Sequence, residues 1–502
     1  MNFDNAIDAV FCNHDLLREI LQYVQGDCFD KDAVSLCCQA WKSALDIVVK
    51  KISCNYINSL PILAARFVNV EVIDISQVFG SVTDFYLECI ASHFSLRLVA
   101  LKCEDNNIFI ASSVTDRGLI AISSCTRLRN LALSGLERCT SVGYGNLFRG
   151  CCDLEQLRLN RLISRNTDQE QDIGYNIVQA LFANCHNLSS LDLSCRVFDD
   201  RCLPLIFGCS RLKFLTLEGS FTLEHPCLHT MIFQCSLLQD LTIAVGHATI
   251  LPSRQPKFFE DLFCCCPNLH SLQGGTTFSH EAFQLVQLTS LTHLSISNPD
   301  HITQPNFIEV LKANTRLTSV EISSACHTHE GEVNSLFSAA AMNCPRLTRL
   351  VDTSGSLSDS SLQSLMFTTT LRHLDLCSST ITSYGLGVVA SACRSLLEIH
   401  LDFCLRVEDF GLQCLTAGCM RLQTIHIQGC SKLTNLGLVS LATCSCLEDL
   451  DVSYSQIDDA TLLAILRGTP RMRILDLAAC NQLVDASAVA ACPTLISVNL
   501  EG

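Results

Sequence analysis

The sequence is poor in charged residues, and basic residues are the scarcer kind. Of its 502 residues 17% are charged, and 34 Lys and Arg stand against 50 Asp and Glu, which gives a net charge of −16 at pH 7. Non-specific binding to nucleic acid needs a basic surface, so this composition argues against a nucleic-acid partner. The acidic excess favours solubility and partners that carry basic segments.

Signatures of common enzymes and of membrane proteins are also absent. The chain has no Gly-rich phosphate loop, no G-x-S-x-G and no H-E-x-x-H motif, and we therefore expect no catalytic activity. It has no apolar run of about 18 residues that could span a bilayer, and residues 1–5 lack the basic start of a signal peptide. We expect a protein of the cytoplasm or nucleus that has no membrane partner.

A recurring hydrophobic phrase is the dominant feature of the chain. The phrase is C/N/T-x-x-L-x-x-L-x-L, as in Cys125, Leu128, Leu131 and Leu133. Most intervals between successive copies are 24 to 26 residues, which lies within the range of leucine-rich repeats. The 17 copies open at positions 67, 93, 125, 151, 185, 209, 235, 266, 288, 314, 344, 368, 393, 419, 444, 469 and 492.

Each copy predicts one strand, one turn and one helix. In Leu374-Asp375-Leu376 two apolar side chains enter a core and the residue between them faces outward. Thr382 is a suitable N-cap for the helix that fills the rest of its repeat. Stacked units of this kind form an α/β leucine-rich-repeat solenoid, or horseshoe, with a parallel concave sheet and convex helices. We expect one such solenoid of about 17 repeats over residues 53–502.

Cysteine is abundant, with 32 residues, and many of its positions follow the repeat. Disulfide frameworks are typical of secreted proteins, but one periodic position cannot pair with itself along a stack. We therefore expect the repeat cysteines to be buried, small and reduced, in agreement with a protein of the cytoplasm or nucleus. Eleven cysteines open a repeat: Cys125, Cys151, Cys185, Cys209, Cys235, Cys266, Cys344, Cys393, Cys419, Cys444 and Cys492.

Residues 1–52 do not follow the repeat and predict two short amphipathic helices. Two helices of this size cannot form a stable core alone, so we expect them to pack on the solenoid or on a partner. The first apolar stripe comprises Leu16, Leu17, Ile20, Leu21 and Val24. The second stripe comprises Val34, Cys37, Cys38, Leu45 and the only tryptophan of the chain, Trp41.

This helical segment resembles an F-box. The stretch D-L-L-R-E-I-L-Q-Y-V at 15–24, and C-Q-A-W at 38–41 with Leu45, match the two halves of that motif. An F-box directly followed by cysteine-containing leucine-rich repeats resembles the F-box/LRR substrate receptors of cullin-based ubiquitin ligases, and this resemblance covers nearly the whole chain. It implies that the F-box docks on a small adaptor that binds the cullin, while the repeats bind the protein to be ubiquitinated. It places the adaptor-binding face at Leu16, Leu17, Ile20, Leu21, Val34, Cys38 and Trp41.

Two alternatives stay open. Residues 1–52 can instead form a helical cap that protects the edge strand of the first repeat. The chain can also be an F-box-independent leucine-rich-repeat scaffold, or an inhibitor of a partner protein.

Four intervals between repeats are long, and their extra residues follow the strand. They lie at 103–112, 161–172, 246–257 and 325–332, and we expect them to emerge at the carboxyl ends of the parallel strands. Insertions on one face often mark a binding face. Surface insertions also cost little entropy, so neutral drift is the alternative.

Outward strand positions of the last repeats carry acidic residues and histidines, including His373, but no Lys or Arg. Strands about 4.8 Å apart bring these side chains together, as a docking surface for a basic peptide or as an ordinary solvated face. The only full cations at outward positions are Lys102, Arg158 and Arg349, so we expect no cofactor like the inositol phosphate of plant F-box/LRR hormone receptors. The candidate substrate-binding residues are Asp375, Glu398, His400, Asp402, His426, Asp449, Asp451 and Asp476.

No metal site is expected in this chain. Cys326, His327 and His329 share an inserted segment, and thiols cluster at 264–266 and 444–446. None of these groups has the paired spacing of a structural zinc site. Free cysteines and exposed histidines are the simpler interpretation.

Overall fold

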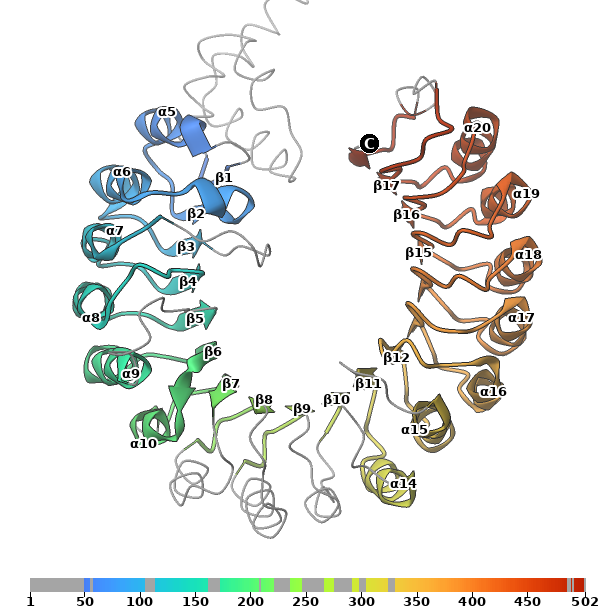
Figure 1. Ribbon diagram of the computed structural model, residues 1–502, viewed down its shortest axis with the longest axis horizontal. Helices are drawn as coiled ribbons and strands as arrows, with labels where there is room; N and C mark the ends of the chain where they lie inside the picture. The colour runs from blue at the N-terminus through green and yellow to red at the C-terminus, as the bar shows by residue number, and fades with distance from the viewer. Residues whose placement is uncertain are drawn as a thin grey trace, which may run out of the picture. The chain divides into compact units, whose positions relative to one another are not determined.

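The computed structural model describes residues 49–54, 57–103, 113–160, 172–206, 209–220, 235–245, 266–274, 291–297, 304–323, 330–484, 489 and 492–500 (Figure 1). The chain forms two compact units, Met1–Ile250 and Leu251–Gly502.

In the first unit, strands form one layer and helices the other (Figure 1). The strands are β1 (Lys51–Ser53), β2 (Val72–Asp74), β3 (Ala100–Cys103), β4 (Asn130–Ser134), β5 (Gln156–Asn160), β6 (Ser190–Asp199), β7 (Phe214–Ser220) and β8 (Asp240–Val245). The α-helices are α5 (Leu60–Arg66), α6 (Asp84–Phe94), α7 (Asp116–Ile122), α8 (Ser141–Gly150), α9 (Ile173–Asn184) and α10 (Leu203–Ile206). Short 3-10 helices are η1 (Ile57–Ser59), η2 (Ser76–Ser81) and η3 (Asp200–Cys202).

The second unit has the same two layers. Its strands are β9 (Ser271–Gly274), β10 (His293–Ser297), β11 (Ser319–Ser323), β12 (Arg349–Asp352), β13 (His373–Asp375), β14 (Glu398–His400), β15 (Thr424–His426), β16 (Asp449–Asp451), β17 (Ile474–Asp476) and β18 (Ser497–Asn499). Its helices are α14 (Gln304–Ala313), α15 (Glu330–Asn343), α16 (Asp359–Leu362), η5 (Gln363–Phe367), α17 (Ser383–Ala392), α18 (Asp409–Gly418), α19 (Asn435–Leu438), η6 (Val439–Thr443) and α20 (Asp459–Gly468).

Within each unit, consecutive strands pair in parallel, β1 through β8 and β9 through β18. The register places equivalent repeat positions opposite each other, for example Leu131 opposite Leu157. Both of these leucines are buried, with 2% exposed, and the residues between such leucines face the other side. The expected α/β leucine-rich-repeat solenoid is therefore confirmed.

The repeat phrase predicts the strands closely. Each described strand from β2 to β18 begins five residues after the opening of its copy, except β3, which begins at Ala100 rather than at position 98. The sequence prediction missed β1, which pairs with β2, because its only buried residue is Ile52 and it has no L-x-L pattern. Strand β1 also spans the expected boundary between residues 52 and 53, so the sheet begins before that boundary.

Cysteines that open the repeats form a hydrogen-bonded ladder in the core. The thiol of Cys151 lies 3.5 Å from the carbonyl oxygen of Cys125. The thiol of Cys185 lies 3.4 Å from the carbonyl oxygen of Cys151. A small apolar residue with a weak donor fits this place, because it packs and also serves a buried carbonyl group. Burial is confirmed for the cysteines that open the repeats, except for Cys492, which is half-buried in the last described repeat.

In the described ranges a threonine side chain caps α7, α8, α17 and α19, as the sequence predicts for Thr382. The hydroxyl of Thr382 accepts a hydrogen bond from the backbone N–H of Tyr384 at 3.2 Å, and Thr434 caps α19 in the same way. None of the helices in the described ranges has both the length and the apolar character needed to cross a bilayer.

Candidate binding surfaces

Strands β13 to β17 carry the acidic residues and histidines that the sequence analysis selected, except Asp402, which lies in the turn two residues after β14. We call the set Asp375, Glu398, His400, Asp402, His426, Asp449, Asp451 and Asp476 the acidic surface. The alternate residues of these strands, such as Leu374 and Ile399, are fully buried, so the polar residues face the opposite side. The parallel register brings the acidic surface onto one face of the sheet.

The register arranges these side chains in two rows. His373, Glu398, Thr424 and Asp449 lie side by side on consecutive strands. Asp375, His400, His426, Asp451 and Asp476 form the second row. Strands β13 to β17 contain no Lys or Arg, and Arg349 lies opposite His373 on the neighbouring strand β12.

Backbone hydrogen bonds hold most aspartates of the acidic surface in place. The Oδ1 atoms of Asp375, Asp451 and Asp476 each accept a hydrogen bond, at 2.9–3.0 Å, from the backbone N–H two residues later. Asp402 accepts one at 2.8 Å from the N–H of Gln428 in the next repeat. These carboxylates therefore have a structural role at the exits of the strands, and they also project negative charge from fixed positions.

Three histidines form a continuous line across this surface. The ring of His400 lies 5.2 Å from that of His373 and 4.3 Å from that of His426, measured between ring centroids. Burial, followed by the neighbouring His426, lowers the pKa of His400. A hydrogen bond to Asp449 raises the pKa of His426, whose Nε2 lies 3.6 Å from the Asp449 carboxylate. Burial raises the pKa of Asp402.

Two exposed aromatic residues flank the acidic surface at the strand exits. Phe403 and Tyr454 are 48% and 60% exposed, with backbone φ angles of 58° and 57°. A positive φ is uncommon for such bulky residues. Gly429 lies between them along the stack, and a Cβ atom there would come within 2.7 Å of the Phe403 ring. Exposed aromatic side chains are enriched in protein interfaces, and the sequence analysis missed this pair.

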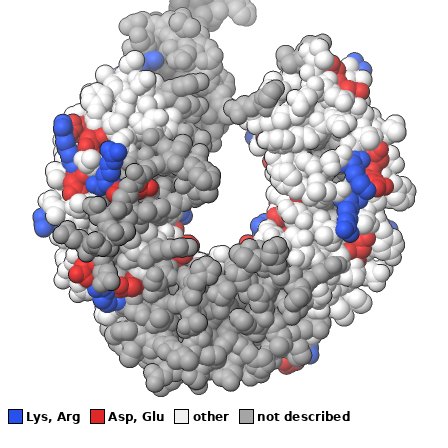
Figure 2. All heavy atoms as spheres, in the orientation of Figure 1, with Lys and Arg blue, Asp and Glu red and all other residues white. Residues whose placement is uncertain are grey.

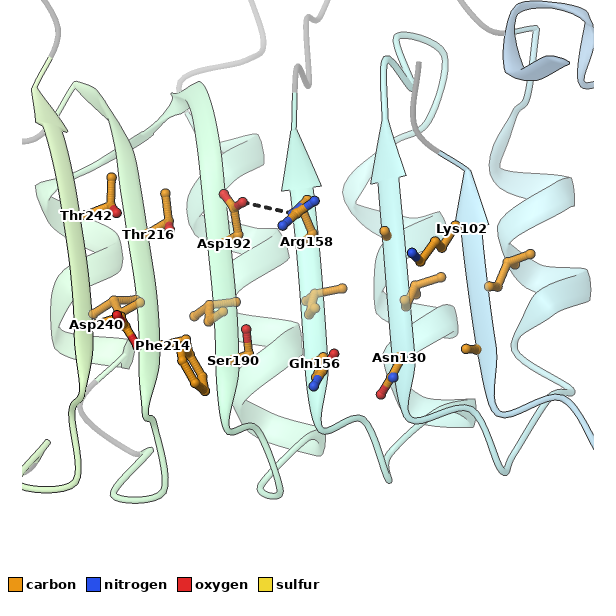
Figure 3. Close-up of a pocket in the computed structure, with 17 residues that line it drawn as sticks. Lys102, Asn130, Gln156, Arg158, Ser190, Asp192, Phe214, Thr216, Asp240 and Thr242 are labelled. Carbon is orange, nitrogen blue, oxygen red and sulfur yellow. Dashed lines mark ion pairs between the residues drawn. The ribbon is translucent and has the colours of Figure 1, made fainter. Parts of the chain in front are cut away.

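A hollow of about 400 Å³ lies on the strand face of the first unit, over β3 to β8 (Figure 3). Arg158 and Asp192 form an ion pair of 3.1 Å across its wall, and burial raises the pKa of Asp192. Phe214 is 44% exposed at an outward position. The labelled lining residues are Lys102, Asn130, Gln156, Arg158, Ser190, Asp192, Phe214, Thr216, Asp240 and Thr242.

This hollow differs from the acidic surface in its charge. It combines both signs with neutral polar groups, and the Arg158 charge is balanced by Asp192. On the face shown in Figure 2, Lys and Arg lie beside Asp and Glu in each unit rather than in patches of one sign. The acidic surface is therefore the stronger candidate for charge-dependent recognition.

Other predicted sites lie largely outside the described residues. This is so for the adaptor-face residues Leu16, Leu17, Ile20, Leu21, Val34, Cys38 and Trp41, for the cysteine and histidine segment 326–329, and for most of the inserted segments. In the first unit the described flanks of three insertions are strand ends, at Cys103, Asn160 and Val245. The strands are parallel, so these insertions begin at the carboxyl ends of strands, as expected.

The comparisons with known proteins found matches among solved structures at low sequence identity. No protein-family model matches the chain, and no curated protein matches it. A chain of the yeast Rad7 and Elc1 complex is 17% identical, with a TM-score of 0.46 over 88% of this chain and 92% of that chain. The internalin inlF from Listeria monocytogenes is 13% identical, with a TM-score of 0.35 over 84% and 90%. A chain of the TLR13–ssRNA13 complex is 15% identical, with a TM-score of 0.43 over 83% and 64%.

Proposed function

We propose that this chain is a non-catalytic substrate-recognition subunit of an SCF-type E3 ubiquitin ligase in the cytoplasm or nucleus. The order of its parts carries the proposal. An F-box-like segment at 15–45 directly precedes leucine-rich repeats that open with cysteine, which is the arrangement of the receptors that the sequence resembles. Residues 1–52 then bind the adaptor that carries the cullin, and the repeats hold the target protein.

The acidic surface supports the second half of this proposal. Four of its six carboxylates are fixed by backbone hydrogen bonds, so these lose little side-chain entropy when a cationic partner binds. Each exposed ion pair contributes only about 0.2 to 1 kcal/mol, and several must act together. The target is therefore expected to carry a segment with several Lys or Arg residues. The exposed aromatic residues Phe403 and Tyr454 are available beside it for apolar and cation–π contacts.

Binding of the purified adaptor to the full-length chain tests the first half. Leu17→Glu and Trp41→Ala change residues of the apolar stripes, whereas Gln22→Ala changes a residue of the same segment outside them. We expect the first two variants to lower adaptor affinity at least tenfold, as for buried apolar contacts at an interface, and Gln22→Ala to leave it unchanged. If a deletion is used, it should stop before Val49, because Val49 is buried and Lys51–Ser53 pair with β2.

A second candidate function is that of an F-box-independent scaffold or inhibitor. The residues that favour it are Asn13 and His14, which stand where the F-box pattern has Leu and Pro. An intact chain that binds its protein partner but no adaptor supports this second function and contradicts the first.

A further inference from the structure

Three metal-ligating side chains meet on the strand face of β13 and β14. One ring nitrogen of His373, one ring nitrogen of His400 and one carboxylate oxygen of Glu398 all lie within 4.8 Å of one another. The fold brings them together because His373 lies opposite Glu398 in the register and His400 follows two residues later on the same strand face. The intervening Leu374 and Ile399 are fully buried and fix both strands.

The contacts of His373 resemble those of a metal-binding imidazole. Its side chain is 12% exposed, and its Nδ1 atom lies 2.5 Å from Oε2 of Glu398. Its Nε2 atom is buried and has no hydrogen-bond partner among the described residues. A buried ring nitrogen without a partner needs an explanation, and an ion bound at Nε2 would supply one. Glu398 would then leave Nδ1 and turn to the ion as a ligand.

We propose that His373, Glu398 and His400 together bind one divalent transition-metal ion, with zinc as the preferred ion. Two imidazoles and one carboxylate are a common zinc donor set, with Zn–N and Zn–O distances of about 2.0 to 2.2 Å. Ligand atoms in a tetrahedral site are about 3.4 Å apart. Atoms that lie up to 4.8 Å apart must therefore approach one another, and the 2.5 Å contact between His373 and Glu398 must open. Glu398 can supply most of this movement, since its side chain is 46% exposed.

The surrounding charges have a defined arrangement. Asp375 lies opposite His400 in the register and adds negative charge, whereas Arg349 lies opposite His373 on the other side. His426 is next to His400 but contacts Asp449, which leaves the remaining coordination position for water or a partner side chain. The sequence analysis placed the three proposed ligands on one sheet face but looked for metal ligands only among residues close together in the chain. His373 and Glu398 are 25 residues apart, which is one repeat.

Metal titration of the full-length chain, kept reduced, tests this inference independently of the ubiquitin-ligase proposal. We expect one Zn²⁺ per chain to bind at this site by calorimetry, and Co²⁺ to give weak visible bands without a thiolate charge-transfer band. Glu398→Gln and His400→Gln should each lower Zn²⁺ affinity at least tenfold, while His186→Gln, at an exposed position of the first unit, should not.

Glu398 is the safer position for the decisive variant because its side chain is exposed, and thermal unfolding should show that Glu398→Gln remains folded. The inference is overturned by a wild-type chain that binds neither ion. Wild-type affinity in both Glu398→Gln and His400→Gln, or a Co²⁺ spectrum dominated by thiolate bands, overturns it equally. Adaptor binding is not affected by any of these results, so failure here leaves the proposed function standing.

Discussion

The carboxylate of Asp359 accepts two hydrogen bonds from Thr382, the N-cap residue of the next repeat. The backbone N–H of Thr382 donates at 2.8 Å and its hydroxyl at 2.6 Å. The start of α17 is thereby fixed to the helix before it, which complements the apolar stacking of the repeats. The same paired contact joins Asp84 to Thr115, Asp116 to Thr140, and Asp409 to Thr434.

Substitutions at two glycines of α17 test how closely neighbouring repeats pack. A Cβ atom on Gly385 would lie 2.3 Å from Oδ1 of Asp359, whereas a Cβ atom on Gly387 would meet nothing within 4 Å. We expect Gly385→Ala to destabilise the protein by about 1 to 3 kcal/mol through overpacking. Gly387→Ala should stabilise it by up to about 1 kcal/mol, because alanine favours a helix. Urea unfolding of both variants measures the difference, and equal midpoints would contradict the close contact.

Buried Asp352 predicts a pH-dependent effect on stability. Burial raises its pKa to about 6, and the side chain is 0% exposed. In the unfolded chain the pKa is about 3.9. The pKa of Asp352 is higher in the folded than in the unfolded chain, so protonated Asp352 stabilises the fold. This contribution is fully present below about pH 3.9 and is lost as the pH rises through about 6. At neutral pH the ionised group then costs about 1 to 3 kcal/mol.

Asp352→Asn removes this cost, since an amide can keep the contacts to the Ser354 N–H and hydroxyl, at 3.3 and 3.1 Å. We expect the variant to be more stable than the wild type at pH 7.5 and nearly equal to it at pH 4. Urea midpoints across that range measure the difference in stability between the variant and the wild type. A difference of the same size at both pH values would show that ionisation of Asp352 is not its cause.

Two adjacent cysteines should differ in reactivity. Cys151 is buried and Cys152 is exposed. Burial raises the pKa of Cys151, and since the thiolate is the reactive form, the protonated Cys151 should react slowly in the folded protein. Alkylation at pH 8 followed by peptide mass spectrometry should find Cys152 modified first and Cys151 modified only after denaturation. Equal rates in the native protein would contradict the predicted burial.

The acidic surface should bind through its charge. Asp402→Asn, Asp449→Asn and Asp451→Asn in one chain remove three charges, and the asparagines at 402 and 451 can still accept the backbone hydrogen bonds from Gln428 and Ser453. We expect binding of a Lys- and Arg-rich partner to weaken by about 1 to 2 kcal/mol at low salt, and by less at high salt.

Asp74→Asn is the matched control for this triple variant. Asp74 accepts the same type of hydrogen bond, from the N–H of Ser76 at 3.1 Å, but it lies on β2 of the first unit. Its substitution should leave partner binding unchanged. If partner affinity changes neither in the triple variant nor with ionic strength, the acidic surface is a solvated surface that does not bind the partner.

The fold was predictable from sequence because its signal is local and periodic. Leu374, Asp375 and Leu376 alternate, and their pattern recurs near every 25 residues, so strand positions follow from the repeat itself. The contacts between repeats were not predictable in the same way. The Asp359 and Thr382 pair joins residues of two helices, and the left-handed backbone of Phe403 and Tyr454 depends on the turn geometry of the stack.

The candidate site was predictable only in part. The sequence correctly placed Asp375, His400 and Asp451 on one sheet face, because equivalent repeat positions stack. It did not reveal that the Oδ1 atoms of Asp375 and Asp451 bind the backbone, since that depends on how the chain turns after each strand. The distances among the ligand atoms of His373, Glu398 and His400 also needed the structure, because they depend on side-chain conformation.

Quantitative affinity purification of the tagged full-length chain from cells, followed by mass spectrometry, tests the central claim most directly. The intact chain should capture the adaptor, the cullin and a target protein with a basic segment. Leu17→Glu should lose the adaptor and cullin but keep the target. The triple variant at Asp402, Asp449 and Asp451 should capture less of the target but keep the adaptor and cullin. Capture of neither adaptor nor cullin by the intact chain would contradict its assignment to a ubiquitin ligase.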